Sequence, residues 1–95
     1  MLIQTPIAAN DIVTIKLLTG EEVMATLINN EGDTITIKKP STIASNGQGM
    51  GIVPWMMTSR AESVEINKTA VIAMARTEEE IAKAYTETTS SIKLA

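Results

Sequence analysis

Three clustered glycines, two glutamate runs and a few lysines are the residues most suggestive of chemistry. Gly47, Gly49 and Gly51 lie in the segment NGQGMG. Such loops bind phosphate when their backbone N–H groups and the N-terminus of a following helix surround the anion. The apolar segment IVPW that follows indicates a strand instead of a helix. We therefore expect the glycines to form the tip of a hairpin.

The glutamates, Glu21–Glu22 and Glu78–Glu80, are of a type that serves in general acid–base catalysis. Adjacent carboxylates on a turn, or in the first turn of a helix, are usually solvated, and no partner residue separates their pKa values. The chain has no Cys and no His, which excludes thiolate nucleophiles, imidazole ligands, disulfides and a Ser-His-Asp relay. We expect no enzymatic activity, no catalytic residue, no metal site and no cofactor.

The charge balance limits binding of nucleic acid to local patches. Eight Lys and Arg face eleven Asp and Glu, so the net charge is −3. A chain of this charge has no global field that attracts polyanions. Lys38 and Lys39 form a basic pair, and Arg60, Lys68 and Arg76 are scattered. Each is expected to be solvated surface unless the fold or an assembly brings several together.

The protein is expected to be soluble and intracellular. The first ten residues, MLIQTPIAAN, lack the basic flank and long apolar core of a signal peptide. No apolar run approaches the roughly 18 residues that a membrane span needs. We therefore expect no membrane association.

The elements that must position these residues belong to one small domain of 95 residues. A chain this short buries only about 60–65 % of the surface that it exposes when unfolded, so its core must be small. Only Trp55 and Tyr85 are aromatic, and the core must be built from Ile, Val, Leu, Met and Ala. This composition suits a small β-barrel filled by branched side chains.

Alternation of apolar and polar residues predicts five strands. The segment DIVTIKLL places Val13, Ile15 and Leu17 on one face, and EVMATLIN repeats the pattern after a turn in which Gly20 takes a positive φ. NNEGD is a second turn. The expected strands are 11–18, 22–29, 34–45, a long bent strand 52–66 interrupted at Pro54 and near Arg60, and 70–75.

Pro40 and the segment TEEEIAKAY mark two local features. Pro40 lacks a backbone donor, so the third strand should bulge or lie at an edge there. Thr77 is expected to cap a helix over 77–89, with Glu80 completing a capping box, and the inward stripe would be Ile81, Ala84, Tyr85 and Thr88. The barrel then spans about 11–76, and residues 90–95 form a loose tail.

The segment IVPWMM has six consecutive uncharged residues, more than one face of a small barrel requires. An exposed apolar edge strand aggregates unless something covers it. The cover could be the C-terminal helix or a partner subunit that pairs with the edge. We favour the partner subunit, because a small core cannot bury both faces of the strand.

The order of these elements resembles the Sm-like family, five-stranded bent barrels that assemble into rings. In VTIKLLTGEEVMATLINNEGDTITI, Gly20, Val23, Leu27 and Asp33 match the first family signature, and Ala25 stands where a second glycine is usual.

The second signature has two possible registers. VEINKTAVIAM matches its frame, but Asn67 and Lys68 replace the usual Arg–Gly pair and Thr69 replaces the acid or amide. SRAESV offers a competing register with Arg60 in the arginine place. We prefer the first, because it leaves a full fifth strand.

The resemblance covers about residues 11–76, and the helix after the barrel departs from the family pattern. The combination is most similar to divergent Sm-like proteins encoded by phages, including marine ones. It implies a mainly β fold, a five-stranded bent Sm-like or SH3-type barrel with a C-terminal helix, in the cytoplasm of a bacterium or a phage-infected host.

The resemblance also implies an assembly and a ligand. Family analogy predicts a homo-oligomeric ring of about five to seven subunits, in which the fourth strand pairs with the fifth of a neighbour. The interface residues would be Ile52, Val53, Trp55, Met56, Met57, Val71, Ile72 and Met74.

Single-stranded, uridine-rich RNA would bind at the loops after the second strand and before the last one, in a non-catalytic or RNA-chaperone role. Carried over, the RNA-binding residues are Asn30, Asp33, Thr34, Asn67, Lys68 and Thr69. Neither loop has an aromatic residue to stack on a base, but Lys68 repeated around a ring would make a positive pore. The alternative is a structural or protein-interaction ring, related to a phage, without RNA binding.

Overall fold

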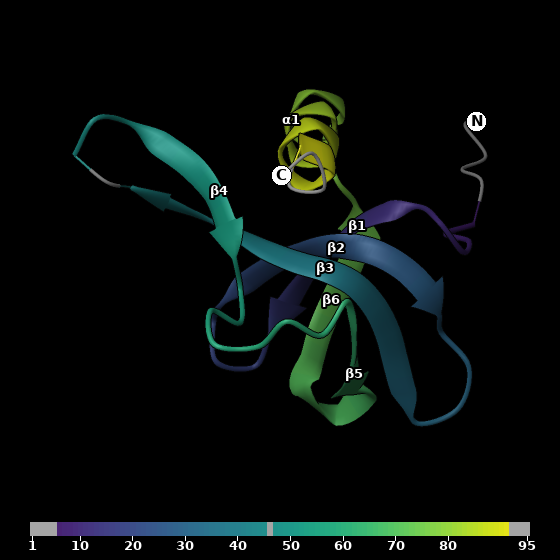
Figure 1. Ribbon diagram of the computed structural model, residues 1–95. Helices are drawn as coiled ribbons and strands as arrows, with labels where there is room; N and C mark the ends of the chain where they lie inside the picture. Colours follow the sequence, from purple (N-terminus) through teal and green to yellow (C-terminus); the bar gives the residue numbers. More distant parts are fainter. Residues whose placement is uncertain (1–5, 46, 92–95) are drawn as a thin grey trace, which may run out of the picture.

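The computed structural model describes residues 6–45 and 47–91, which form a bent antiparallel sheet and one α-helix (Figure 1). The strand order is β4-β3-β2-β1-β6, and β5 also pairs with β3. The mainly β fold class expected from the sequence is confirmed. The elements are β1 Ile12–Leu17, β2 Glu22–Asn29, β3 Thr34–Ser45, β4 Met50–Pro54, β5 Ser63–Asn67, the 3₁₀ turn η1 Lys68–Ala70, β6 Val71–Arg76 and α1 Glu79–Ser91.

The long strand β3 carries two short strands on one of its edges. Its first part, Thr34–Lys38, pairs with β5, and its last part, Ser41–Ser45, pairs with β4. The β3–β4 hairpin extends away from the barrel as an arm (Figure 1). Gly47 and Gly49 form the hairpin connection with φ angles of 88° and 136°, as expected for a tip and not for a phosphate loop.

The fourth strand expected over 52–66 is divided into β4 and β5, a correction to the predicted five strands. Residues 55–62 leave the sheet between them. Trp55 still donates its N–H to the Pro40 carbonyl at 2.9 Å, and Lys39 donates to the Glu62 carbonyl at 2.9 Å. The excursion therefore begins and ends beside the same irregularity in β3.

That irregularity is a β-bulge at Lys39 and Pro40. Met24 pairs with Ser41 and Thr26 with Lys38, so one extra residue is inserted in β3. Lys39 has a φ of 53°, in the left-handed region. The bulge expected from Pro40, which has no N–H to donate, is confirmed.

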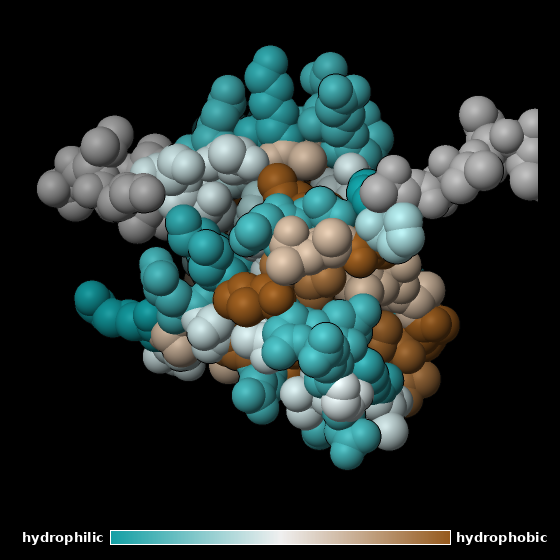
Figure 2. Space-filling view, turned by 90° about the vertical axis from the view of Figure 1, so that its right-hand side faces the viewer, coloured by the Kyte–Doolittle hydropathy of each residue, from teal (hydrophilic) through white to brown (hydrophobic). Residues whose placement is uncertain are grey.

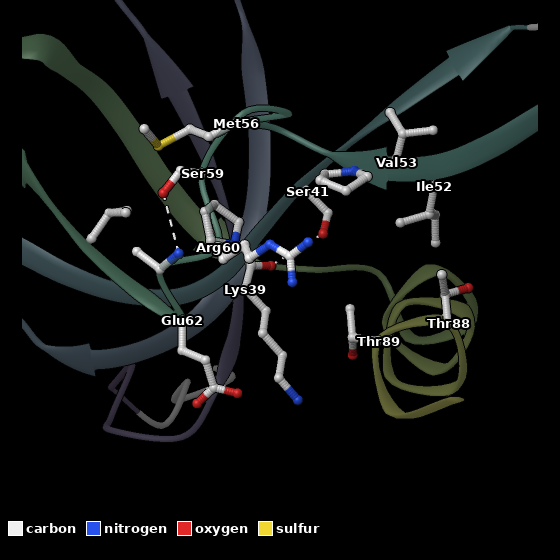
Figure 3. A pocket seen from close by; sticks show the side chains of 14 residues that line it. Lys39, Ser41, Ile52, Val53, Met56, Ser59, Arg60, Glu62, Thr88 and Thr89 are labelled. Atoms are coloured by element: carbon white, nitrogen blue, oxygen red, sulfur yellow. Dashed lines mark hydrogen bonds between the residues drawn. The ribbon is translucent and has the colours of Figure 1, made fainter. Parts of the chain in front are cut away.

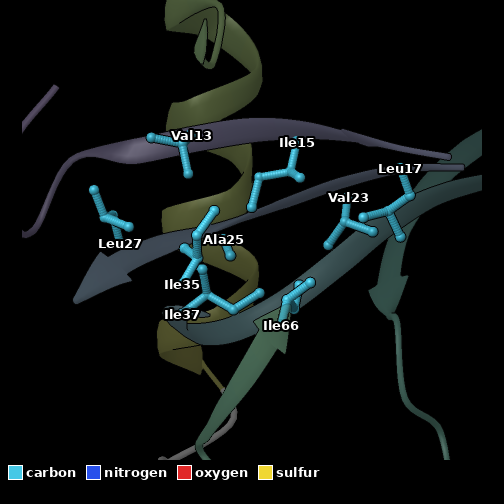
Figure 4. Packing of buried hydrophobic residues seen from close by; sticks show 9 residues of the cluster. All are labelled: Val13, Ile15, Leu17, Val23, Ala25, Leu27, Ile35, Ile37 and Ile66. Atoms are coloured by element: carbon cyan, nitrogen blue, oxygen red, sulfur yellow. The ribbon is translucent and has the colours of Figure 1, made fainter. Parts of the chain in front are cut away.

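The barrel core lies on the concave side of the bent sheet, where side chains of four strands meet (Figure 4). The alternation in β1 and β2 predicted the inward faces correctly. Gly20, with a φ of 97°, makes the turn between these strands, and its N–H donates to the Leu17 carbonyl at 2.9 Å. The core residues are Val13, Ile15, Leu17, Val23, Ala25, Leu27, Ile35, Ile37 and Ile66.

Helix α1 packs on the opposite, outer face of the sheet, so it covers its own barrel. Tyr85 is buried there, and its hydroxyl contacts the Lys38 and Lys39 carbonyl oxygens, each at 3.0 Å. Met24 is also buried, although its neighbours Val23 and Ala25 face the core. A strand with both faces covered gains burial on each, which explains why three consecutive residues of β2, 23–25, are buried.

The start of α1 differs from the predicted capping box. The Glu80 N–H donates to Glu78 Oε2 at 3.1 Å, and the Ala82 N–H donates to the Glu78 carbonyl at 2.8 Å, so Glu78 caps the helix. Thr77 is instead engaged with Thr14, their hydroxyl oxygens being 2.8 Å apart. Contact with β1 therefore displaces Thr77 from the cap.

The inward stripe and the end of α1 also differ from expectation. Ile81 and Tyr85 face the sheet as predicted, but Ala84 and Thr88 are exposed, and Ala82 and Thr89 are half-buried instead. The helix continues through Ser91, two residues beyond the expected end. Of the predicted tail, residues 92–95 lie outside the described residues.

Candidate functional site

The structure brings the two loops predicted to bind RNA together at one end of the barrel. Lys68 Nζ donates to the Asn30 carbonyl at 2.8 Å, and the Lys68 N–H donates to the Asp33 carbonyl at 2.9 Å. Thr34 and Asn67 are direct partners across the β3–β5 pair. The β2–β3 loop and η1 thus form one surface, called the loop site below.

Local turn chemistry fixes the shape of the loop site. Asn29 Oδ1 accepts the Glu31 N–H at 2.9 Å, and Gly32 takes a φ of 81°. Side chains of Asn and Asp favour such turns because they bond to the backbone two residues on. η1 then reverses the chain between β5 and β6 in three residues. The loop site is therefore held by hydrogen bonds at both of its loops.

The polar groups of the loop site are accessible but its charge is not positive. Asn30, Asp33, Asn67 and Thr69 are exposed, and Thr34 and Lys68 are half-buried. Amide and hydroxyl groups of these types can bond to base edges. The site holds one Lys68 ammonium and the carboxylates of Glu31 and Asp33, so each subunit contributes a net charge of −1 there.

Strands β5 and β6 each have one edge without a partner strand in residues 6–45 and 47–91. β5 pairs with β3, and β6 pairs with β1. Such edges present unpaired N–H and C=O groups that can pair with another chain. On β6 the side chain of Ile72 is 60 % exposed. These two edges are the ones that the family resemblance predicts to meet in a ring.

The predicted interface residues occupy three different environments. Trp55, Val71 and Met74 pack partly against the barrel core. Ile52 and Val53 lie on β4, where they line a cavity that Met56 also lines. Apolar surface is spread over several elements, and Figure 2 shows patches of it among polar atoms on one face. The most exposed of the predicted set are Met56, Met57 and Ile72.

The cavity lies between the β3–β4 hairpin, residues 55–62 and the end of α1, and it was not predicted from the sequence (Figure 3). Lys39 and Arg60 both line it. In the sequence, only the position of Lys39 next to Pro40 could have indicated this cavity, because a β-bulge changes the direction of a side chain. Arg60 is 21 residues away in the chain, and only the fold brings the two together.

Comparison with protein families decides the identity of the fold. The family model of the Sm_like domain matches residues 14–86, which is more than half of the chain. The chain belongs to the Sm-like family. The matched region of this Sm-like protein includes the loop site, the two strand edges and part of α1. A search of curated proteins gives no match.

The described part of this Sm-like protein has no cluster of metal ligands and no helix able to span a membrane. No group of three His, Cys, Asp or Glu side chains within residues 6–45 and 47–91 is placed to hold a metal ion. In the same residues, no helix has the length and apolar character needed to cross a bilayer.

Proposed function

We propose that this Sm-like protein forms a homo-oligomeric ring that binds single-stranded RNA at the loop site, without catalysis. The observation that carries the proposal is the hydrogen bond from Lys68 Nζ to the Asn30 carbonyl, which joins the two loops into one surface. RNA in the Sm-like family binds at these loops. The exposed amides and hydroxyls of the site would bond to bases, with uridine-rich RNA as the expected ligand.

The ring would form by pairing β5 of one subunit with β6 of the next. Both edges are open in the described residues, and each strand has five or six residues available for pairing. Strand addition at a sheet edge gains main-chain hydrogen bonds, and side chains such as Ile72 add apolar burial. Closed cyclic symmetry leaves no free edge, and about five to seven subunits are expected by family analogy.

A ring changes the electrostatics of the loop site. Each copy would add one Lys68 ammonium, together with the carboxylates of Glu31 and Asp33, close to the symmetry axis if the loop sites face a central pore. Several weak contacts to consecutive phosphates then act together, and the combined affinity exceeds that of one site. A cytoplasmic location and an origin among phage-encoded relatives are parts of the same proposal.

A protein-interaction or structural ring is the second candidate, favoured by the acidic character of the loop site. Glu31 and Asp33 outnumber Lys68, and neither loop has an aromatic residue. Single-stranded nucleic acid is usually held by stacking as well as by charge. In that case the ring would form in the same way, and the loop site would contact a protein.

Light-scattering mass with and without oligo-U RNA tests the proposal. A closed oligomer that gains mass with RNA is the expected result, and the gain should shrink at high salt. A closed oligomer that ignores RNA would support the protein-interaction ring, and a monomer would refute the assembly.

Two variant pairs locate the contacts. Ile72→Lys, on β6, should lower the mass, whereas Ile43→Lys, on the β3–β4 arm, should not. Lys68→Glu should lose RNA binding, and Lys83→Glu, with the same charge change on the exposed face of α1, should retain it. Equal loss in both lysine variants would mean that only net charge matters.

A further inference from the structure

The cavity beside α1 has the size of a small-molecule site. Its volume is about 510 Å³, within the range of about 300–1,000 Å³ typical of ligand sites. Its lining combines apolar and charged side chains, and Figure 3 shows Ile52 and Val53 on one side with Lys39, Arg60 and Glu62 on the other. The apolar side chains include Ile52, Val53, Pro54 and Met56.

Lys39 occupies a backbone conformation that a lysine rarely adopts. Its φ is 53°, and the left-handed region is unfavourable for any residue with a Cβ. Residues held in such conformations cluster at functional sites, where the surrounding structure over-determines them. At this bulge, the effect is to direct the Lys39 side chain into the cavity (Figure 3).

Tyr85 holds the bulge from the opposite side. Its buried hydroxyl is 3.0 Å from the Lys38 carbonyl oxygen and 3.0 Å from that of Lys39. Ser41 Oγ also donates to the Lys39 carbonyl at 3.1 Å. With its carbonyl bonded twice and its N–H bonded to Glu62, the Lys39 peptide cannot turn without breaking several hydrogen bonds.

The two cationic side chains have no anionic partner of their own. Within the described residues, neither the Lys39 ammonium nor the Arg60 guanidinium forms an ion pair or a side-chain hydrogen bond. Glu62 also lines the cavity, so its three charged groups sum to +1. Half-buried Lys39 and exposed Arg60, beside the apolar side chains of β4, are complementary to a ligand with an anionic head and an apolar body.

We propose that this cavity binds a carboxylate attached to an apolar group. The carboxylate would lie between Lys39 and Arg60, since a guanidinium fork matches carboxylate geometry, and the apolar group would lie against Ile52, Val53 and Met56. A single negative charge balances the net +1, whereas a phosphate dianion would leave an excess charge. Either a free carboxylic acid or the C-terminal residue of a polypeptide presents this chemistry. The proposal does not depend on ring formation or RNA binding.

NMR titration of the ¹⁵N-labelled full chain tests the proposal with four probes. Hexanoate represents a free acid and N-acetyl-leucine a polypeptide C-terminus; hexanamide and N-acetyl-leucine amide are their neutral controls. The expected result is saturable shifts at Lys39, Arg60 and Thr89 with at least one carboxylate and none with its amide. A response to hexanoate alone identifies a free acid, and a stronger response to N-acetyl-leucine identifies a C-terminus. Absence of saturable binding, or equal binding of the amide, overturns the proposal.

Variants at the cations complete the test. Lys39→Gly removes the ammonium and suits the positive φ, so the fold should be retained. Its affinity for the carboxylate, and that of Arg60→Gln, should fall by about tenfold or more, because a charged hydrogen bond is lost. Lys83→Gln, on the exposed face of α1, is the matched control and should bind like the wild type. Wild-type affinity in both Lys39→Gly and Arg60→Gln would overturn the proposal.

Discussion

Tyr85→Phe is the most informative single substitution, because it removes one oxygen from a fully packed position. The Tyr85 hydroxyl contacts the Lys38 and Lys39 carbonyl oxygens and lies 3.2 Å from Thr26 Oγ1. The side chain is only 2 % exposed. The phenyl ring stays in place, so the change leaves no large cavity and isolates the hydrogen bonds.

The expected loss follows from the partners that remain. The Lys39 carbonyl keeps the Ser41 hydroxyl, whereas the half-buried Lys38 carbonyl and Thr26 Oγ1 lose their contact with the Tyr85 hydroxyl. Loss of a buried hydrogen bond costs about 1–2 kcal/mol of the free energy of unfolding. For a domain of this size, each kcal/mol corresponds to a Tm about 4–8 °C lower.

Urea unfolding followed by Trp55 fluorescence measures the free energy of unfolding, and hydrogen exchange reports on the bulge itself. The Lys39 amide, bonded to the Glu62 carbonyl, should lose protection in Tyr85→Phe. Thr86→Val is the matched control, since it removes an exposed hydroxyl from the same helix and should change stability by less than about 0.5 kcal/mol. All proteins are compared at one subunit concentration, because oligomerisation contributes to stability.

The reasoning fails if Tyr85→Phe unfolds within about 0.5 kcal/mol of the control. It also fails if stability falls but protection of the Lys39 amide is unchanged. The second result would mean that the hydroxyl stabilises the helix contact without holding the bulge.

Three further predictions concern backbone geometry and pH. Gly20→Ala should destabilise by about 1–2 kcal/mol in urea unfolding because its φ is 97°, whereas Gly51→Ala, without a positive φ or a close neighbour, should be neutral. Lys39→Gly should raise the free energy of unfolding by about 0.5–1 kcal/mol, because glycine adopts the positive φ of this position without strain. Lys38→Gly, in extended strand, should lower it, and the same change in both variants would contradict the argument. Burial raises the pKa of Tyr85 above its ordinary value of 10.0, so the folded state holds the phenolic proton more tightly than the unfolded state. The contribution of Tyr85 to the free energy of unfolding is therefore complete below pH 10 and is lost as the pH rises through the raised pKa. Above pH 10, this free energy should fall more steeply in the wild type than in Tyr85→Phe; parallel plots of it against pH would disprove the prediction.

Much of the barrel could be predicted from local patterns. The period-two alternation of β1 and β2 identified Val13, Ile15, Val23 and Ala25 as core, because a one-residue slip would expose every one of them. Pro40 predicted the bulge through its missing donor. The division of the fourth strand was missed, because the excursion at 55–62 depends on pairing with two separated halves of β3.

The candidate sites were predictable to different degrees. The two loops predicted to bind RNA followed from the family frame, and the structure brings their residues together at the loop site. The contact between Lys68 and Asn30, which are 38 residues apart, needed the fold. The helix contacts were less predictable: Thr77 bonds to Thr14 and not to its own helix, because a residue 63 positions away competes for its hydroxyl.

The sequence by itself determined strands β1, β2 and β3, the inward faces of β1 and β2, the turns at Gly20 and Gly32, and the absence of thiol and imidazole chemistry. These depend on side-chain period, on backbone freedom and on residue type, which are local properties. Only the tertiary structure decided which face α1 covers, that Tyr85 locks the left-handed Lys39, and that Lys39 shares a cavity with Arg60. The physical reason is that contacts between residues distant in the chain depend on how the sheet bends, and the alternation of apolar and polar residues does not specify that bend.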